Sequence, residues 1–254
     1  MNKRYFHDVE RFCVFIGYPG SGHTLIGSLL DAHPNAIIAD ECNVLKYVDA
    51  GFSRQQIFYL LSRNSQLAAA AGRKRAGYFY HVPGQWQGRF QKLRLIGDKK
   101  AGAFSYRMTA QPPLLERLQR LVNVEITFIH VIRNPYDIIS TLSLRSGAPL
   151  AVSVKNFFTR CGRVESIKRR VKPTDVYDLR HEDFLRSPKA GLRDLGNFLN
   201  LPADEKFFDA CASIVFQSAH QSRFDAPWNQ ALIDTVKQNM ARHEFLDAYG
   251  YDEP

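Results

Sequence analysis

The order of apolar runs and turns predicts an α/β protein, with a central parallel sheet and helices on both faces. Short runs rich in β-branched and aromatic residues, typical of buried strands, alternate with segments of helical periodicity. Chemically distinctive residues directly follow four of the predicted strands, at 17–24, 40–41, 98–100 and Arg133. Because open parallel sheets bind ligands beyond the carboxyl ends of their strands, we expect these four segments to converge on one site.

The first half of the chain supplies three predicted strands. In chain order we expect a strand at 12–17, a helix at 23–33, a strand at 35–40, helices within 43–71, a long aromatic loop or lid at 77–90, and a strand at 93–100. Apolar residues at helical spacing mark the first helix, and Pro34 follows its end. The stretch 77–90 has no clear period, which favours a loop.

The second half continues the alternation. We expect a helix at 112–122, a strand at 125–132, a helix at 134–145, a basic helix at 152–171, a strand at 175–180, a turn and helix within 181–202, and a mostly helical C-terminal part. The strand pattern is strongest at 125–132. No internal repeat or linker interrupts the sequence, so we expect a single domain over residues 1–254.

Composition limits the classes of partner. Lys and Arg number 34 against 25 Asp and Glu, a net charge of +9, which suits an anionic ligand. Paired Cys/His ligands and an aromatic RNA-binding signature are missing, so we expect neither nucleic-acid binding nor a metal site. The N-terminus has no apolar leader, and no run reaches membrane-spanning length. We therefore expect a cytoplasmic protein without a membrane span.

The segment 17–24, G-Y-P-G-S-G-H-T, is close to the nucleotide-binding P-loop G-x-x-x-x-G-K-[ST]. A glycine turn between a strand and a helix aims backbone N–H groups and the positive end of the helix at one point, where a phosphate can bind. His23 stands in place of the lysine that reaches the β- and γ-phosphates in NTPases, and Arg133 stands where a Mg²⁺-binding aspartate is wanted. The loop therefore indicates a cradle for one phosphate, with a plain glycine turn as the structural alternative.

Three groups of residues together resemble the family of sulfotransferases that use 3′-phosphoadenosine 5′-phosphosulfate (PAPS). They are YPGSGHT followed by LDAHP, the segment HVIRNPYDIISTL, and GDKK. The stretch 19–41 is similar to tyrosylprotein sulfotransferases and their bacterial relatives, and the resemblance runs over nearly the whole chain. It implies the P-loop-containing nucleotide-binding fold of sulfotransferases, PAPS as co-substrate, adenosine 3′,5′-bisphosphate (PAP) as product, and no metal.

The resemblance also implies roles for individual residues. Glu41 would be the base that accepts the acceptor's proton, and Lys99 the cation at the transferred group. The nucleotide would be bound by Gly20, Ser21, Gly22, His23, Thr24, Leu25, Arg133 and Thr141, with Arg223 and Trp228 closing over it. The acceptor would be a hydroxyl of a small molecule or carbohydrate, covered by the lid residues Tyr78, Tyr80, His81 and Trp86. A homodimer is compatible with the resemblance.

Two residues depart from the family pattern. Gly20 stands where the family usually has Lys or Arg, and His23 replaces a threonine. We expect Lys99 to supply the missing charge, assisted by Lys100 or His23. Two alternatives stay open at this point: a P-loop kinase or NTPase, and a non-catalytic module that binds a nucleotide.

Overall fold

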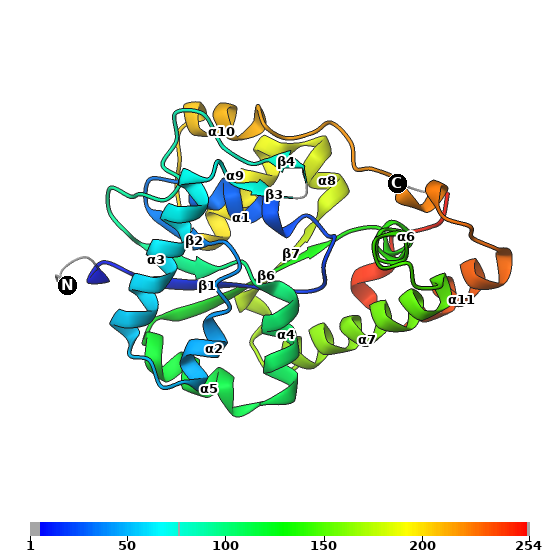
Figure 1. Ribbon diagram of the computed structural model, residues 1–254. Helices are drawn as coiled ribbons and strands as arrows, with labels where there is room; N and C mark the ends of the chain where they lie inside the picture. The colour runs from blue at the N-terminus through cyan, green and yellow to red at the C-terminus, as the bar shows by residue number, and fades with distance from the viewer. Residues whose placement is uncertain (1–5, 76, 253–254) are drawn as a thin grey trace.

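A five-stranded parallel sheet forms the centre of the protein (Figure 1). The computed structural model describes residues 6–75 and 77–252. The strands of this sheet are β1 (Arg11–Ile16), β2 (Ala36–Ala39), β5 (Leu95–Asp98), β6 (Glu125–Ile132) and β7 (Val176–Arg180). They lie in the order β2-β5-β1-β6-β7, and each neighbouring pair is parallel. The expected α/β class and parallel sheet are confirmed.

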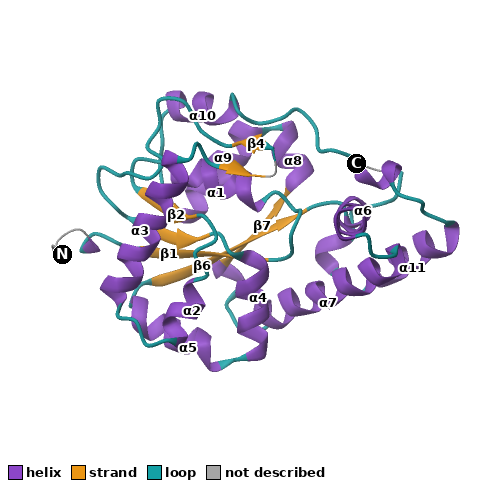
Figure 2. Cartoon of the chain, viewed as in Figure 1, coloured by secondary structure: helices purple, strands orange, loops and turns teal. Residues whose placement is uncertain are grey.

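Figure 2 shows helices on both sides of this sheet. The longer helices are α1 (His23–Asp31), α3 (Arg54–Ala70), α4 (Ala101–Ala110), α5 (Pro113–Val122), α6 (Pro135–Ser146), α7 (Leu150–Lys168), α9 (Pro188–Leu199), α10 (Glu205–Ala212) and α11 (Gln230–Met240). The shorter ones are α2 (Val44–Asp49) and α8 (His181–Arg186). In this view α1, α8, α9 and α10 lie on one side of the sheet, and α2, α4 and α5 lie on the other.

The side chains of the strands contribute to two hydrophobic cores, because helices cover both faces of the sheet. Phe12, Val14 and Ile16 of β1 pack with α2 to α5 on one face. Cys13 and Phe15 pack with α1, α8 and α9 on the other face. These five side chains are fully buried. A third apolar cluster joins α6, α7 and α11 beyond the end of the sheet.

The connection between β1 and α1 occupies a special place in this topology. The chain leaves β1 to form β2 on one side of it, and later forms β6 on the other side. Ligands of open parallel sheets bind at such a switch point, outside the carboxyl ends of the strands. Residues 17–22 therefore lie where the architecture favours a ligand site.

The structure adds two elements that the sequence pattern did not predict. Helix α4 follows β5 directly, although its apolar stripe is weak and no side chain caps its N-terminus. It is held instead by packing, since Phe104 and Met108 are buried in the core. The expected loop at 77–90 contains β4 (Tyr78–Phe79), which pairs with β3 (Lys74–Arg75) just before the loop in a small antiparallel ribbon.

The stretch 181–202, predicted to hold a turn and one helix, contains two helices, α8 and α9. Within 6–75 and 77–252, no helix combines the length and apolar character needed to cross a bilayer.

Candidate active site

A cavity of about 1000 Å³ opens at the carboxyl edge of the sheet. Its wall includes the loop after β1, Glu41 after β2, Lys99 and Lys100 after β5, and Arg133 after β6. The four segments expected to converge do so. Such a volume is at the upper end of the range for small-molecule sites.

The loop after β1 forms a cradle of backbone N–H groups. Gly20 and Gly22 have φ of 92° and 97°, a conformation that glycine adopts without strain. Gly22 immediately precedes α1, which has neither a capping side chain nor an acidic residue in its first turn. Within the described chain, the N–H groups of residues 20–25 donate no hydrogen bond. They fit a bound phosphate, which also gains from the positive end of the helix.

Two side chains of this loop serve the loop itself. Ser21 is fully buried, and its Oγ donates to the carbonyl of Tyr18 at 2.8 Å. Of the groups through which Ser21 was predicted to bind the nucleotide, the hydroxyl is therefore turned away from the cavity, and only the backbone N–H stays in the cradle. The side chain of His23 folds back toward β1, with Nε2 3.2 Å from the carbonyl oxygen of Ile16.

His23 also explains Gly17, whose added Cβ would lie 3.0 Å from the His23 ring. Burial, and then the nearby His130, lower the pKa of His23 to about 3. The ring is therefore neutral, and the expectation that His23 assists Lys99 as a cation is wrong. Only its backbone N–H remains available to an anion.

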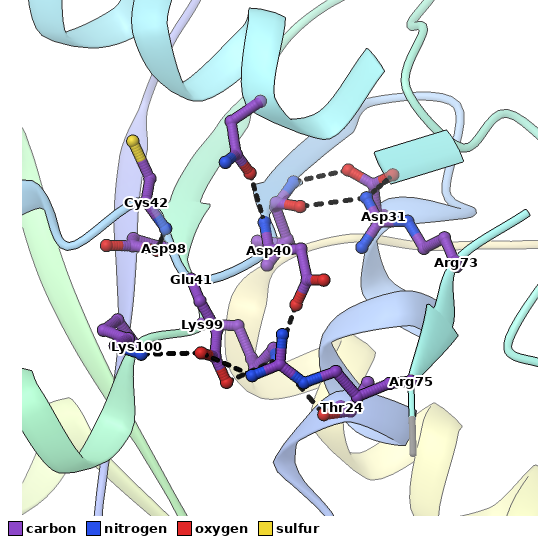
Figure 3. Close-up of polar contacts among 12 residues, drawn as sticks. Thr24, Asp31, Asp40, Glu41, Cys42, Arg73, Arg75, Asp98, Lys99 and Lys100 are labelled. Atoms are coloured by element: carbon purple, nitrogen blue, oxygen red, sulfur yellow. Dashed lines mark hydrogen bonds and ion pairs between the residues drawn. The ribbon is translucent and has the colours of Figure 1, made fainter. Parts of the chain in front are cut away.

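Glu41 lies between three cations (Figure 3). Its carboxylate is 2.6 Å from Lys100 Nζ, 2.6 Å from an Arg75 guanidinium nitrogen and 3.4 Å from Lys99 Nζ. Burial acts to raise the pKa of Glu41, but the Lys100 hydrogen bond and the neighbouring charges hold it at about 2. The carboxylate is therefore ionised at neutral pH.

Lys99 is buried and links this cluster to the loop. Its Nζ lies 2.5 Å from Asp40 Oδ1, and it donates to Thr24 Oγ1 at 3.1 Å. Thr24 sits in the first turn of α1, where the N–H groups of the cradle are. The predicted catalytic pair is thus in contact, and it adjoins the predicted phosphate cradle.

A buried carboxylate positions Glu41. Asp98, at the end of β5, accepts from the backbone N–H of Cys42 at 3.0 Å and of Val44 at 2.7 Å. These bonds hold a tight turn in which Glu41 and Asn43 have φ of 61° and 63°. Non-glycine residues adopt this conformation rarely, and such strain is concentrated at functional sites. Burial raises the pKa of Asp98 to about 6.

Arg75 is a site residue that sequence reasoning missed. It comes from the ribbon, whose base is held by a buried network around Asp31 at the end of α1 (Figure 3). Asp31 pairs with Arg73 and accepts from Ser65 Oγ at 2.7 Å and the Gly88 N–H at 2.9 Å. The only signal in the sequence was the basic run at 73–75, which a solvated surface loop would also show.

Two further residues that could bind an anion, Arg133 and Thr141, adjoin the loop. Arg133 donates to the carbonyl of Gly20 at 3.0 Å and to the carbonyl of His220. Thr141, two turns along α6, donates to Ser222 Oγ at 2.9 Å. Arg133 and Thr141 both line the cavity, as expected. Since a guanidinium and a hydroxyl suit phosphate oxygens, this pair can hold a phosphate apart from the cradle.

Arg223 and Trp228 do not close over the cavity, contrary to expectation. The Arg223 side chain is 1% exposed and pairs with Asp137 of α6 at 2.8 Å. Trp228 donates to Ser140 Oγ at 2.8 Å and packs on Tyr136. Both side chains fasten the C-terminal segment to α6, and they thereby place residues 218–220 and Ser222 on the cavity wall.

The lid residues divide into two groups. Tyr78 and Tyr80 line the cavity, and the Tyr78 ring packs edge-on against Phe216 with centroids 5.5 Å apart. The side chain of His81 is exposed. Trp86 lies near the C-terminal end of α1, where its backbone N–H donates to the Ala32 carbonyl. Neither of these two is part of the cavity wall. Leu25, which was predicted to bind the nucleotide rather than to form the lid, also lines the cavity.

His181 is a further wall residue that the sequence did not indicate. Its ring lies under Gly22, where an added Cβ would come within 2.5 Å of it. Burial, and then the charge of Arg133, lower the pKa of His181 to about 3.

In the described segments, no group of three or more His, Cys, Asp or Glu side chains is arranged to hold a metal ion.

The chain matches the sequence profile of the sulfotransferase family over residues 14–205. No curated protein sequence matches it significantly. Among solved structures, a sulfotransferase of Mycobacterium avium is 12% identical with a TM-score of 0.56, over 95% of this chain and 77% of that one. The sulfotransferase domain of the Synechococcus PCC 7002 olefin synthase is 17% identical with a TM-score of 0.51, over 91% of this chain and 88% of that one. These structures share the P-loop-like fold of the sheet and its loop.

Proposed function

Because the chain belongs to the sulfotransferase family, we propose that it transfers the sulfuryl group of PAPS to a hydroxyl group of a small-molecule or carbohydrate acceptor and releases PAP. One observation carries the proposal furthest. A carboxylate, Glu41, contacts Lys99 and Lys100 directly beside a loop whose N–H groups are available to an anion. Sulfuryl transfer needs these parts, because an attacking hydroxyl must lose a proton while negative charge builds on the leaving oxygen.

The two anion sites fit the two phosphorylated ends of such a nucleotide. The N–H cradle at residues 20–25 would bind the 5′-phosphate, with Lys99 next to it through Thr24. Arg133 and Thr141 would bind the 3′-phosphate. A nucleoside triphosphate is a poorer match, because the neutral His23 occupies the place of the lysine that contacts its terminal phosphates.

Glu41 would accept the proton of the acceptor hydroxyl as its oxygen forms a bond to sulfur. The bond from sulfur to the bridging oxygen breaks, and that oxygen leaves on PAP. Lys99 and the cradle would stabilise the charge that develops there. With a pKa of about 2, Glu41 is a weak base while it is paired with three cations. A sulfuryl group would compete for those cations, and this competition raises the basicity of Glu41 where the acceptor binds.

Transfer of ³⁵S-sulfate from PAPS to a panel of phenols, sugars and acidic sugars tests the proposal. We expect labelled product from the wild-type protein and a loss of about 10²–10⁴-fold in turnover for Glu41→Gln. PAP should bind this variant as tightly as the wild type or more tightly, because a negative charge has been removed beside an anion site. Glu116→Gln, on the exposed surface of α5, is the matched control and should behave as wild type. Unchanged turnover in Glu41→Gln would remove Glu41 as the base.

A further inference from the structure

Two arginines of α7, Arg160 and Arg163, line the cavity without an acidic partner in the described part of the chain. The other cations near the reacting groups are paired. Lys99 and Lys100 contact Asp40 and Glu41, Arg75 contacts Glu41, and Arg133 donates to backbone carbonyls. Arg160 and Arg163 thus carry positive charge into the cavity that no neighbouring carboxylate neutralises.

Arg160 is held in an unfavourable setting. Its side chain is half-buried, and its Nη1 is buried without a hydrogen-bond partner among residues 6–75 and 77–252. Burial, and then the charge of Arg163, lower the pKa of the guanidinium. Arg163 lies over the ring of Tyr106, 5.0 Å from its centroid. A buried donor without a partner costs stability, so an anion that entered here would recover favourable interactions.

These arginines and Glu41 line the same cavity, and helix α4 adjoins both: Arg163 contacts Tyr106 of α4, and Glu41 contacts Lys100 just before it. Helix α4 begins beside Lys100, which pairs with Glu41, and its residues 101–103 and Ser105 line the cavity. Ser105 Oγ accepts from the N–H of Gly17, which ties α4 to the loop. Helix α7 packs on the same loop, where Tyr18 contacts Phe157 with centroids 4.7 Å apart. Figure 1 shows α4 next to one end of α7.

The part of the cavity wall that follows Lys100 has small side chains. Ala101, Gly102 and Ala103 form it, and a Cβ added at Gly102 would approach nothing nearer than Pro19 at 3.7 Å. An elongated molecule can therefore lie along α4 with one end at Glu41 and the other at α7. Arg145 also lines the cavity, but it lies on α6 and its charge acts on Tyr80 rather than on the wall formed by α4 and α7.

Resting on the proposed function, we propose that the acceptor is anionic, and that Arg160 and Arg163 bind its carboxylate, phosphate or sulfate group while its hydroxyl faces Glu41. The charges of the nucleotide are already matched by the cradle and by Arg133 with Thr141. A pair of guanidinium groups matches the oxygens of such an anion in charge and geometry. The arginine pair thereby selects acidic acceptors over neutral ones of the same shape.

Inorganic phosphate, titrated into the protein saturated with PAP at constant ionic strength, probes this subsite. We expect calorimetry to detect phosphate binding in the wild type and a loss of about tenfold or more in affinity in Arg160→Gln/Arg163→Gln. PAP affinity, measured first, should be the same in both proteins. Arg160→Gln should not lower the free energy of unfolding, because it removes a charge that has no partner and is repelled by Arg163.

Arg170→Gln is the matched control. Its guanidinium donates to the carbonyls of Met108 and Pro112, joining the region after α7 to α4 and α5. This variant should lose stability and keep the phosphate affinity, the opposite of Arg160→Gln. If Arg160 had only a structural role, Arg160→Gln would behave like Arg170→Gln: it would lose stability and keep its phosphate affinity. That result would overturn the inference.

The outcomes separate this inference from the proposed function. If PAP fails to bind the wild type, both the proposed function and the inference about the acceptor are contradicted. If PAP binds but is weakened about tenfold by Arg160→Gln/Arg163→Gln, the arginines belong to the nucleotide site and the inference alone is overturned. It is also overturned if phosphate does not bind the PAP complex, or if phosphate binds the double variant as tightly as the wild type.

Discussion

Glu41 combines a rare backbone conformation with three cationic neighbours, and both features follow from its place after β2. The turn that raises its φ to 61° is held by Asp98, and the cations come from the end of β5 and from the ribbon. A depressed pKa at this position affects stability as well as chemistry.

We expect Glu41 to make acid unfolding steeper. Its pKa is about 2 in the folded protein against 4.5 for the unperturbed group, so the ionised form favours the folded state. That stability is fully present above about pH 4.5 and is lost as the pH falls toward 2. Denaturant titrations at pH 5 and pH 3 should show a larger decrease in the free energy of unfolding for wild type than for Glu41→Gln. Equal decreases in the two proteins would contradict the assigned ion pairs.

Gly20 tests whether the loop geometry itself binds the nucleotide. An alanine at φ of 92° is strained by about 1–2 kcal/mol, and the strain must distort the cradle or destabilise the fold. Gly51→Ala is the matched control, since Gly51 has φ of 79° with no atom near an added Cβ and lies outside the cavity wall. We expect similar losses of stability by denaturation but weaker PAP binding by calorimetry only in Gly20→Ala. If Gly20→Ala and Gly51→Ala bound PAP with equal affinity, the backbone of residues 20–25 would not be part of the nucleotide site.

Among the secondary-structure elements, α6 holds the C-terminal segment through a buried ion pair, in addition to the Trp228 contact. Asp137 accepts from both the backbone N–H of Arg223, at 3.0 Å, and its guanidinium. Asp137→Asn should lower the free energy of unfolding by about 3–5 kcal/mol, because it removes the charge of a buried pair. PAP affinity should fall too, since residues 220–222 carry partners of Arg133 and Thr141.

The control for that variant is Asp183→Asn. Asp183 pairs with Arg186 on the exposed surface of α8 at 3.0 Å, where such pairs contribute about 0–1 kcal/mol. Thermal and denaturant unfolding should leave it close to wild type. If Asp137→Asn is equally well tolerated, the segment is held by other contacts and its role as a support for Arg133 is wrong.

The sequence predicted some elements well because their signals are local. The strands β1 and β6 are mostly apolar runs, as burial on both faces of the sheet requires, and α6 begins with a proline in its first turn. Helix α4 was not predicted, since packing rather than capping or a strong apolar stripe stabilises it. The ribbon was not predicted because two residues per strand give no periodicity.

The candidate site was predictable to a similar extent. Glu41, Lys99, Arg133 and Thr141 follow strands or begin helices, so a parallel sheet brings them to one cavity. The inward turn of His23 and the burial of Arg223 depend on partners far along the chain, which no short motif encodes. Arg75 reaches Glu41 only because the Asp31 network holds the base of the ribbon.

At the scale of the whole molecule, the net charge of +9 is partly gathered at one edge of the sheet. Of the described side chains in the cavity wall, the basic ones are Arg75, Lys99, Lys100, Arg133, Arg145, Arg160 and Arg163, and the acidic ones are Glu41 and Asp225. An excess of this kind attracts polyanions and increases their rate of association at low salt. It is consistent with a nucleotide and an acceptor that are both negatively charged.

The most direct test of the central claim compares two nucleotides by their effect on thermal unfolding. A ligand that binds the native state at one hundred times its Kd adds about 2.7 kcal/mol of stability. We predict that PAP raises the Tm of the wild type, that ATP with Mg²⁺ raises it much less, and that Arg133→Ala loses the PAP effect. Stabilisation by ATP with Mg²⁺ and none by PAP would contradict the account.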